Sequence, residues 1–592
     1  MQPNQPITQL LLRLWRHISL KRQKQFGLLL FLMVLTAFAE VLSIGAVLPF
    51  LGVLTAPDRI FASPFAQTIT HIFGAKDQEH FLLLLTIAFG LAALLAGSMR
   101  LLLLWASTRI SVEAGVDLSS NVYLRTLYQP YAVHVTRNSS EFINGISGKA
   151  DSVIYGTIMP ILTLIGSSVM LIIILVALLL VDPVMAIAAY GGFGMIYAIV
   201  IRLTRDRLIM NSQIGARETT FVLKALQEGL GGIRDVLIDG TQGLYCRIYR
   251  NANYHMRRAH GNSLFIGASP RFAMEALGML LIATLALILA QQENGIANAI
   301  PILGTLALGA QRLLPVLQQG YHAWSTIRSG QVSLQDILEL LDNPLPKYAG
   351  QLPAPPIPFM HQICLKKISF RYSSELPWVV QGLNLTIAKG SRVGLIGKTG
   401  SGKSTILDIV MSLLQSTEGT LEIDGHPITA ANCRSWQAHI AHVPQAIFLA
   451  DCTIEENIAF GVNTDKIDRV RVRKAAQQAQ IADIIETWPE QYRTFVGERG
   501  IRLSGGQRQR IGIARALYKK ADVIIFDEAT SALDNETEQA VMEAIECLSD
   551  DLTLLIVAHR LTTLKNCTQI VELGSGSVKR IGTYKEIVER TA

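Results

Sequence analysis

The 592-residue chain is poor in charged side chains, which make up 17% of its residues, against about 25% in an average soluble domain. Half of the residues are hydrophobic, and the mean hydropathy is +0.34. The composition therefore favours insertion into a membrane over an ordinary soluble fold. A chain of this length is also too long for one hydrophobic core, so we expect at least two domains.

Cysteine is scarce as well, and it shows no metal-binding pattern. The six cysteines have neither a C-x-x-C pair nor a Cys/His spacing typical of a metal site. We expect reduced, structural thiols. The formal charge of +7 is modest for this length, and no Lys/Arg run carries interleaved aromatic residues. We therefore expect no nucleic-acid partner.

The N-terminal segment lacks the features of a cleavable signal peptide, since the apolar run behind it is too long for a signal h-region. Residues 1–24 include ITQLLLRLWRHISLKRQK, which is basic and amphipathic. This pattern predicts an interfacial elbow helix that leads into the first membrane span.

Six apolar segments are long enough to cross a bilayer. They cover residues 26–54, 80–108, 157–181, 184–204, 264–290 and 296–322. The long connections between them are rich in Arg, whereas the short turns VDPV and QQENG hold no basic residue. The positive-inside rule then places the N-terminus and the long connections in the cytoplasm. We predict a multi-pass transmembrane domain over residues 25–340, with a short external helix at SPFAQTITHIFG between the first two spans.

A proline-rich linker follows the spans. PLPKYAGQLPAPPIP, residues 344–358, holds six of the 21 prolines of the chain, so it continues neither a helix nor a sheet interior. We place the linker at residues 341–358. Beyond it, over residues 359–592, strand-like runs such as SRVGLIG alternate with helical stretches, which predicts an α/β domain with a mainly parallel sheet.

This second domain contains a phosphate-binding loop. GKTGSGKS, from Gly397 to Ser404, fits G-x-x-x-x-G-K-S between a strand-like run and a helix-like run. In such a loop backbone N–H groups surround phosphate oxygens, the lysine reaches the β and γ phosphates, and the final hydroxyl serves Mg²⁺. The predicted fold class is a six-helix α transmembrane domain followed by an α/β P-loop nucleotide-binding domain. The predicted ATP contacts of the loop are Gly397, Lys398, Thr399, Gly400, Ser401, Gly402, Lys403, Ser404 and Thr405.

Three further motifs follow in a fixed order: LSGGQRQRIGIARAL from Leu503, ADVIIFDEATSALD ending at Asp534, and IVAHR. Together with the loop they resemble the ATP-binding-cassette family. The resemblance implies that Asp527 holds Mg²⁺ with Ser404 and Gln445, and that Glu528 is the general base for the attacking water.

The same resemblance implies roles for residues outside the P-loop. His559 corresponds to the switch histidine at the γ-phosphate, Gln445 in AHVPQAIFL to the Q-loop glutamine, and Tyr372 in FRYSS to the aromatic that stacks on adenine. The signature would close on the ATP of a second cassette, with Asp534 at the same interface. Because the base and the signature are both intact, a homodimer with two ATP sites is expected. The signature residues concerned are Ser504, Gly505, Gly506 and Gln507.

The order of the two domains resembles a half-transporter of the exporter type. In that type, two coupling helices in long cytoplasmic loops contact the cassettes. YAVHVTRNSSEFINGI and LQEGLGGIRDVLIDG stand where these coupling helices belong, although each also fits an ordinary solvated helix and turn.

Three arginines interrupt the apolar runs, where a charge is costly. Arg271 and Glu275 are four residues apart, so they share a helix face and are able to neutralise each other. The functional alternative is that Arg100, Arg271 and Arg312 line a cavity for an anionic headgroup, since a guanidinium pairs bidentately with phosphate. A third interpretation is that these arginines are simply in contact with water.

A more specific resemblance is to the lipid-linked oligosaccharide flippases. Three segments carry it: LIGKTGSGKST, TRNSSEF and AEVLSIGAVLPFLGVL. That resemblance implies ATP-driven flipping of a polyprenyl-diphosphate-linked oligosaccharide or a related glycolipid across a bacterial cytoplasmic membrane. One alternative is an exporter of peptides, drugs or other lipids. A more distant one is a membrane-tethered regulatory ATPase that transports nothing.

Overall fold

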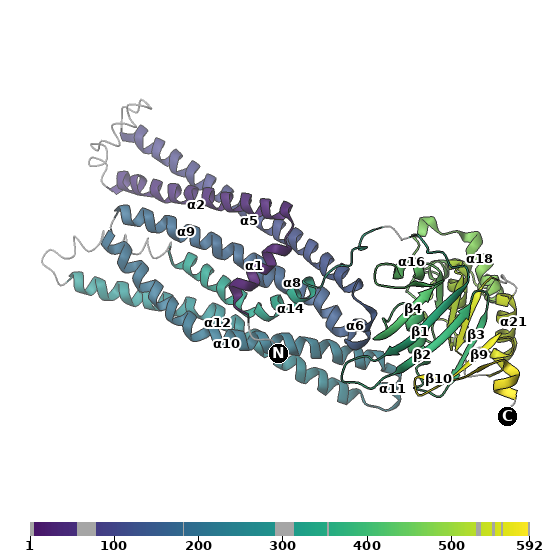
Figure 1. Cartoon of the computed structure of the whole chain (residues 1–592). Helices are drawn as coiled ribbons and strands as arrows, with labels where there is room; N and C mark the ends of the chain where they lie inside the picture. The colour runs from purple at the N-terminus through teal and green to yellow at the C-terminus, as the bar shows by residue number, and fades with distance from the viewer. Residues whose placement is uncertain are drawn as a thin grey trace. The chain divides into compact units, whose positions relative to one another are not determined.

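The computed structural model describes residues 5–55, 78–181, 183–290, 313–351, 355–528, 534–546, 551–557 and 561–589. The chain forms two compact units (Figure 1). The first comprises residues 1–129 and 137–346, and the second comprises residues 130–136 and 347–592. The boundary between them falls inside the proline-rich linker.

The first unit is helical, and several of its helices are far longer than a bilayer requires. At 1.5 Å per residue, the 50 residues of α5 extend for about 75 Å, against a hydrocarbon thickness of about 30 Å. Along their lengths α2 packs on α5, and α10 packs on α12. The elements are α1 (Ile7–His17), α2 (Leu20–Thr55), α5 (Gln78–Leu127), α7 (Ser139–Ile143), η1 (Asn144–Lys149), α8 (Ala150–Val153), η2 (Ile154–Ile158), α9 (Met159–Val181), α10 (Pro183–Gly231), α11 (Ile233–Ile238), α12 (Gln242–Ala290), a helix over 313–329, and α14 (Gln331–Leu341).

Within the described residues, three helical stretches are long and apolar enough to cross a membrane: Leu20–Ser43, His80–Leu127 and Asn144–Val176. Along α5, Leu94 and Leu101 are each 70% exposed, as expected for side chains that face lipid. The segments predicted as the fourth and fifth spans lie in α10 and α12. Most of the sixth, and the external helix predicted between the first two spans, lie outside the described residues.

A proline sits inside α12, immediately before Arg271. Pro270 has no N–H group, so the carbonyl of Ile266 loses its helical partner. The hydroxyl of Tyr321, from the helix over 313–329, donates to that carbonyl oxygen at 3.1 Å. A neighbouring helix therefore satisfies the group that the proline leaves free, as a helix interior in a membrane requires.

The predicted elbow helix is α1, and its apolar face packs on α14. Leu10 and Leu14 are buried in one cluster with Leu334, Leu338 and Leu341, all at 3% exposure or less. Only an amphipathic helix satisfies this arrangement, because the opposite face stays exposed.

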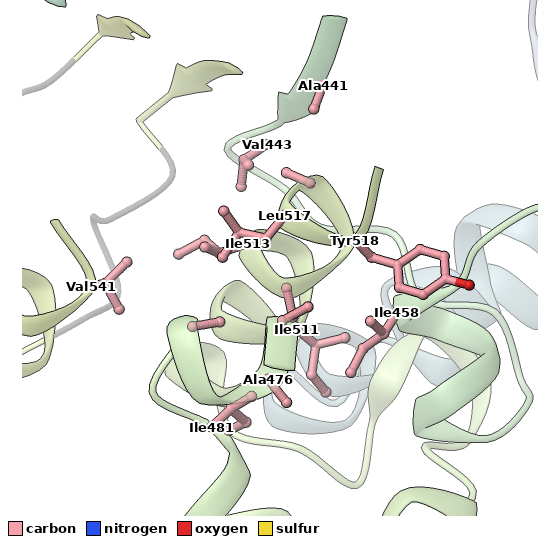
Figure 2. Packing of buried hydrophobic residues seen from close by; sticks show 14 of the residues in the cluster. Ala441, Val443, Ile458, Ala476, Ile481, Ile511, Ile513, Leu517, Tyr518 and Val541 are labelled. Atoms are coloured by element: carbon pink, nitrogen blue, oxygen red, sulfur yellow. The ribbon is translucent and has the colours of Figure 1, made fainter. Parts of the chain in front are cut away.

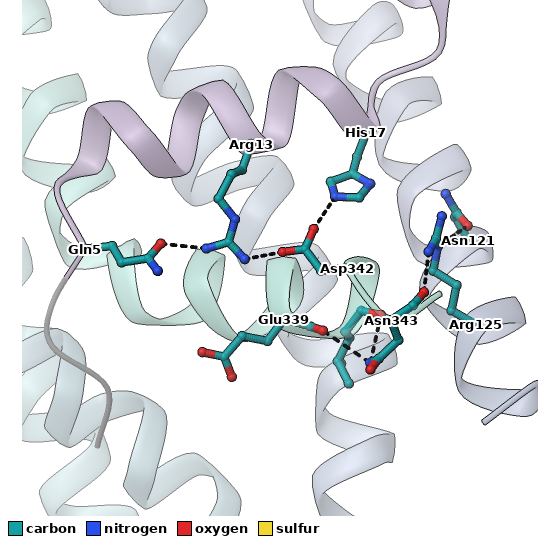
Figure 3. Close-up of polar contacts among 9 residues, drawn as sticks. Gln5, Arg13, His17, Asn121, Arg125, Glu339, Asp342 and Asn343 are labelled. Atoms are coloured by element: carbon teal, nitrogen blue, oxygen red, sulfur yellow. Dashed lines mark hydrogen bonds and ion pairs between the residues drawn. The ribbon is translucent and has the colours of Figure 1, made fainter. Parts of the chain in front are cut away.

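The polar edge of α1 holds the end of α14 (Figure 3). Arg13 and His17 both contact the carboxylate of Asp342, and the His17 Nε2 to Asp342 Oδ1 distance is 2.7 Å. Arg125, near the end of α5, donates to the backbone carbonyl of Asn343. Burial alone would raise the pKa of Asp342, but the bonds from Arg13 and His17 outweigh it and hold the pKa below its usual value. Three elements thus meet at the start of the linker.

The second unit contains two sheets. The larger has the order β10-β9-β3-β8-β7-β6, parallel except for β10, and the smaller is antiparallel with the order β2-β1-β4-β5. The parallel sheet agrees with the predicted α/β domain, whereas the antiparallel sheet was not anticipated. The strands are β1 (Gln362–Phe370), β2 (Val380–Ala388), β3 (Arg392–Gly397), β4 (Glu418–Ile423), β5 (His426–Pro427), β6 (Ile440–Val443), β7 (Val523–Asp527), β8 (Thr553–Val557), β9 (Gln569–Gly574) and β10 (Ser577–Gly582).

Helices complete this unit. Ile511, Ile513 and Leu517 of α20 pack against Val443 of β6 and Ile458 of α17 in a buried cluster (Figure 2). The helices are α6 (Tyr131–Thr136), α15 (Lys403–Val410), α16 (Cys433–Gln437), α17 (Ile454–Ile458), α18 (Arg469–Gln478), α19 (Ala482–Glu486), α20 (Gly505–Lys519) and α21 (Asn535–Glu546), with short turns η3 (Thr464–Lys466), η4 (Gln491–Arg493), η5 (Glu498–Gly500), η6 (Leu561–Leu564) and η7 (Lys585–Glu589).

Replacing Asp342 with Asn should release α1 from α14. Exposed ion pairs contribute about 0.2–1 kcal/mol each, so we expect amide hydrogen exchange in α1 to accelerate roughly two- to five-fold at pH 7. Because the pKa of Asp342 is depressed, its contribution is present above the pKa of an unfolded aspartate and disappears as the pH falls through the native pKa. The difference between native protein and variant should therefore vanish in acid. The control is Glu339→Gln, on the same helix but without a bond to α1; equal acceleration there would contradict the assignment.

Candidate active site

The register of the parallel sheet brings three chain segments to one edge. Val557 of β8 pairs with Leu395 of β3 on one side and with Asp527 of β7 on the other. On β6, Val443 pairs with Phe526 of β7. The turns that follow β3, β7 and β6 therefore leave the sheet at its carboxyl edge, where ligands bind in open α/β sheets.

The predicted phosphate-binding loop lies between β3 and α15, and its glycines are required by geometry. Gly397 has φ +154°, and a Cβ there would lie 2.6 Å from the carbonyl oxygen of Leu573. Gly402 has φ +92° and precedes the first residue of α15. Side chains at these two positions would be strained, so the loop reaches this shape only with glycine.

Other loop residues present polar groups at the start of α15. Lys403 Nζ donates to the carbonyl oxygens of Gly397 at 2.8 Å and of Lys398 at 3.2 Å, so the ammonium lies over the loop. Ser401 is buried, and its hydroxyl has no hydrogen-bond partner among the described residues. Lys398, Thr399, Gly400 and Ser404 are exposed, while Thr405 is buried. The N-terminus of α15 and these donors form the kind of cradle that binds phosphate.

Glu528 follows β7 in a strained backbone conformation. Its φ is +53°, which is rare for a residue with a side chain, and its N–H donates to the carbonyl of Val557 at 2.9 Å. Gln445, two residues beyond β6, donates from Nε2 to Glu528 Oε2 at 2.6 Å. The predicted base and the predicted Q-loop glutamine thus meet, and strain of this kind is often found at functional sites.

Two carboxylates lie near each other beside the loop. Burial, together with a smaller contribution from the negative charge of Asp527, raises the pKa of Asp408 in α15 to about 6. Asp408 is one helical turn after Ser404, so the two share a helix face. Carboxylate and hydroxyl oxygens are the ligands that Mg²⁺ prefers, and it takes one or two carboxylates plus phosphate oxygens at nucleotide sites. Ser404, Asp527 and Gln445 fit such an ion. Among the described residues, no cluster of three His, Cys, Asp or Glu side chains offers a different metal site.

Sequence reasoning missed two neighbours of Asp527. One is Asp408, which its spacing from Ser404 would have revealed. The other is His442 of β6, whose pKa is lowered by burial although the Asp527 charge opposes the shift. The Nε2 atom of His442 has no partner among the described residues. No sequence pattern marks this histidine, because its place depends on the pairing of β6 with β7.

The predicted adenine-stacking aromatic lies close to the loop. The hydroxyl oxygens of Tyr372 and Thr405 are 3.4 Å apart, and the Tyr372 ring packs edge-on against Phe370 at 5.0 Å. Tyr372 is 41% exposed, so part of its side chain is accessible to a ligand.

The signature residues begin α20. Ser504 and Gln507 form a capping box: the Gln507 N–H donates to Ser504 Oγ at 3.2 Å, and the Ser504 N–H donates to Gln507 Oε1 at 2.8 Å. Gly505 and Gly506 open the helix, whose amino end carries partial positive charge. No hydrogen bond within the described chain joins Ser504 or Gln507 to the phosphate-binding loop. The role of the signature toward a second copy stays a prediction.

Asp534 caps a different helix. Its carboxylate accepts bonds from the Thr537 backbone N–H and hydroxyl, both at 2.8 Å, which lowers the pKa of Asp534. The predicted interface aspartate is thus also the start of α21. His559 lies outside the described residues.

The first predicted coupling segment begins with α6, which belongs to the second unit. Ala132 packs against the buried cluster of the two sheets. Burial raises the pKa of Tyr131, and the Asp408 carboxylate adds to the shift. Within the second unit, α6 therefore lies close to α15.

Two of the three arginines in the apolar runs, Arg100 and Arg271, have carboxylate partners. Arg271 Nε donates to Glu275 Oε1 at 2.9 Å, the pair that their spacing allows. Arg100 Nε donates to Glu40 Oε2 of α2 at 3.0 Å, a partner that sequence reasoning overlooked. Protein carboxylates thus provide compensation for both charges. Arg312 lies outside the described residues.

Comparison with known proteins identifies both parts of the chain. The family profile described as ABC transporter matches residues 380–531, and the profile described as ABC transporter transmembrane region matches residues 27–294. The ATP-dependent lipid A-core flippase of Saccharophagus degradans is 31% identical over 507 residues, 81% of each chain. That of Cupriavidus pinatubonensis is 29% identical over 493 residues, also 81% of each chain.

Two other similarities are narrower in what they establish. The alpha-hemolysin translocation ATP-binding protein HlyB of Escherichia coli O157:H7 is 35% identical over 283 residues, 48% of this chain and 39% of that protein. A solved structure of a bacterial Atm1-family ABC exporter with ATP bound has a TM-score of 0.79 and 24% identity, and the match covers 96% of each chain. It confirms the predicted fold class.

Replacing Glu528 with Gln should abolish turnover and spare nucleotide binding. A positioned general base contributes about 10²–10⁴-fold, so we expect the hydrolysis rate to fall at least 100-fold while ATP affinity stays within a few-fold. The measurements are phosphate release and equilibrium binding of labelled ATP. Hydrolysis at the native rate would remove the assigned role.

Two glycine substitutions distinguish the effect of a steric clash with the backbone from the effect of a strained φ angle alone. Gly397→Ala would place a methyl against the Leu573 carbonyl, whereas Gly400→Ala at φ +82° meets open space. Strain alone costs about 1–3 kcal/mol, so we expect both variants to lose stability and Gly397→Ala to lose more. The urea midpoint of the cassette transition measures the difference, and equal midpoints would show that the close approach is unimportant.

Proposed function

This chain belongs to the ABC transporter family, and from that premise we propose that it is an exporter-type half-transporter for a phosphate-bearing glycolipid. It joins a transmembrane region and a nucleotide-binding domain on one polypeptide, and it couples ATP hydrolysis to transport. Under the proposal the cargo moves from the inner to the outer leaflet, and the protein is a multi-pass component of the bacterial inner membrane with its cassette and N-terminus in the cytoplasm.

The observation that carries the proposal is similarity to lipid A-core flippases over 81% of the chain, a share too large to fall within the cassette alone. The match to HlyB extends over less than half of the chain, so it supports protein export less. Lipid A and polyprenyl-diphosphate-linked oligosaccharides share phosphate, sugars and long apolar tails. Within this chemical class we favour the polyprenyl-diphosphate-linked oligosaccharide as cargo, with lipid A-core as the runner-up.

The proposed hydrolysis step uses groups at the sheet edge. The glycine loop and Lys403 bind the phosphates, and Tyr372 stacks on the adenine. Glu528 takes a proton from the attacking water, while Gln445 holds its carboxylate in position. A Mg²⁺ ion held by Ser404, Asp527 and Gln445 would neutralise phosphate charge.

A second copy of the chain completes each site. The amino end of α20, with Ser504 and Gln507, approaches the γ-phosphate bound to the partner, so two ATP molecules hold two cassettes together. Asp534 acts at the same interface, and His559 contacts the γ-phosphate. The economical assembly is a homodimer.

Two short helices transmit closure to the membrane helices. The first is α6, which packs with its own cassette. The second is α11, whose Leu237 and Ile238 are 60% and 75% exposed and offer an apolar contact to the second copy. Closure of the cassettes then opens the cargo path outward.

The arginines of the spans have a secondary role in this proposal. A phosphate that passes Arg100 or Arg271 would compete with Glu40 or Glu275 for the guanidinium. Such an exchange keeps each guanidinium paired with an anion throughout transport. Arg312 is assigned to the same path from its position in the sequence.

The test is flipping of fluorescent lipids in proteoliposomes that hold purified protein. We expect ATP-dependent transfer of a polyprenyl-diphosphate oligosaccharide to the opposite leaflet, with lipid A-core as a parallel substrate and Glu528→Gln as the inactive control. Transfer of lipid A-core alone would replace the favoured cargo and keep the class. Hydrolysis with no transfer of either lipid would contradict the proposal.

A further inference from the structure

A cavity of 460 Å³ with several polar side chains in its wall lies within the helical unit, among η1, α8, α10, α12, the helix over 313–329 and α14. We call it the interfacial pocket and define it by six of its lining residues. This volume falls within the roughly 300–1,000 Å³ of small-molecule sites. η1 is a π-helix, a rare form that is frequent at functional sites. The six residues are Lys149, Asn211, Gly215, Arg257, His260 and Ser263.

The charge of the interfacial pocket is one-sided. Lys149, Arg257 and His260 line it, and no aspartate or glutamate does so among the described residues. Lys149 is paired with Asp336. Arg257 donates from Nε to Asn253 Oδ1 at 3.0 Å, and no acidic partner accompanies it within the described chain. A guanidinium in this state is suited to an anion.

The pocket also contains an unsatisfied buried polar group. Ser263 is 8% exposed, and its hydroxyl has no hydrogen-bond partner among the described residues. Asn211, 7% exposed, adds an amide to the same wall. A buried hydroxyl without a partner costs free energy, so a ligand or water is expected to satisfy it. Hydroxyl and amide groups beside a cation suit a sugar phosphate.

The place of the pocket in the sequence fits a lipid headgroup. Arg257, His260 and Ser263 lie in the middle of α12, immediately before the apolar run 264–290 begins. The positive-inside rule assigns this border to the cytoplasmic side. A lipid bound there would keep its tails in the inner leaflet while its headgroup lies against the pocket.

We propose that the interfacial pocket is the docking site for the phosphate-bearing headgroup of the cargo on the inner-leaflet side. This proposal rests on the proposed function, and it specifies where the headgroup of the cargo first binds. Arg257 and His260 bind the phosphate, and Asn211 and Ser263 bind sugar hydroxyls. The headgroup would then contact Arg100, Arg271 and Arg312 later during transport.

The first experiment compares two adjacent arginines. Protein in phosphatidylcholine nanodiscs is titrated with polyprenyl-diphosphate oligosaccharide, and the stimulation of ATP hydrolysis is normalised to the basal rate of each variant. We expect Arg257→Gln to raise the half-stimulating concentration about tenfold, which corresponds to about 1.4 kcal/mol. Arg258→Gln is the control, because Arg258 contacts Tyr254 and does not line the pocket. Its curve should coincide with that of the native protein.

The second experiment fills the pocket without harming the fold. A Cβ at Gly215 meets nothing within 4 Å, and leucine favours a helix more than glycine does. Gly215→Leu should therefore fold and lose the lipid response. Gly191→Leu, on the same helix with equally open space but outside the pocket, is the matched control.

The outcomes separate the pocket from the function. A native protein that responds to lipid, with unchanged curves for Arg257→Gln and Gly215→Leu, would show a water-filled gap and overturn the pocket alone. A native protein that neither responds to nor flips either glycolipid would overturn the function and the pocket together. Full stimulation by soluble N-acetylglucosamine 1-phosphate would identify a free sugar phosphate as the ligand and would overturn the lipid headgroup.

Discussion

The hydrogen bond from Gln445 to Glu528 depends on the register of four parallel strands. The proposed nucleotide site depends on the same register. With β3, β8, β7 and β6 in this register, the proposed phosphate-binding turn follows β3, the end of β7 supplies Asp527 and Glu528, and Gln445 from the turn after β6 reaches across to Glu528. A slip of one residue in β7 would turn Asp527 to the other face of the sheet. The buried side chains of these strands therefore protect the catalytic geometry as well as the stability.

The same edge concentrates local conformational cost. Glu528 has a positive φ although it carries a side chain, and Asp408 is half-buried near a second carboxylate. Each feature opposes folding by itself and is retained because the surrounding sheet overdetermines it. We propose that binding of ATP and of a second cassette offsets this conformational free energy. The membrane helices also contain groups that are unfavourable alone. The charges of Arg100 and Arg271 are each compensated by an acidic partner.

Sequence alone predicted what depends on short-range spacing. The P-loop, the α/β alternation, the amphipathic α1 and the Arg271–Glu275 pair all follow from residues close together in the chain. The antiparallel sheet, the partnership of Arg100 with Glu40 and the burial of His442 beside Asp527 did not follow. These depend on segments tens of residues apart, which no local periodicity reports. The signature combines both kinds of feature. Its helix cap is formed by residues three positions apart, whereas its proposed role requires another chain.

The central claim is that the Gln445–Glu528 contact at the sheet edge orients the hydrolytic base. A double-mutant cycle in single-turnover ATP hydrolysis tests it most directly, with Gln445→Ala, Glu528→Asp and the double variant. If the contact positions the base, the two effects are coupled, and removal of Gln445 slows the Glu528→Asp enzyme far less than it slows the native enzyme. Strictly multiplicative effects would show that the two residues act independently, and that result would contradict the account.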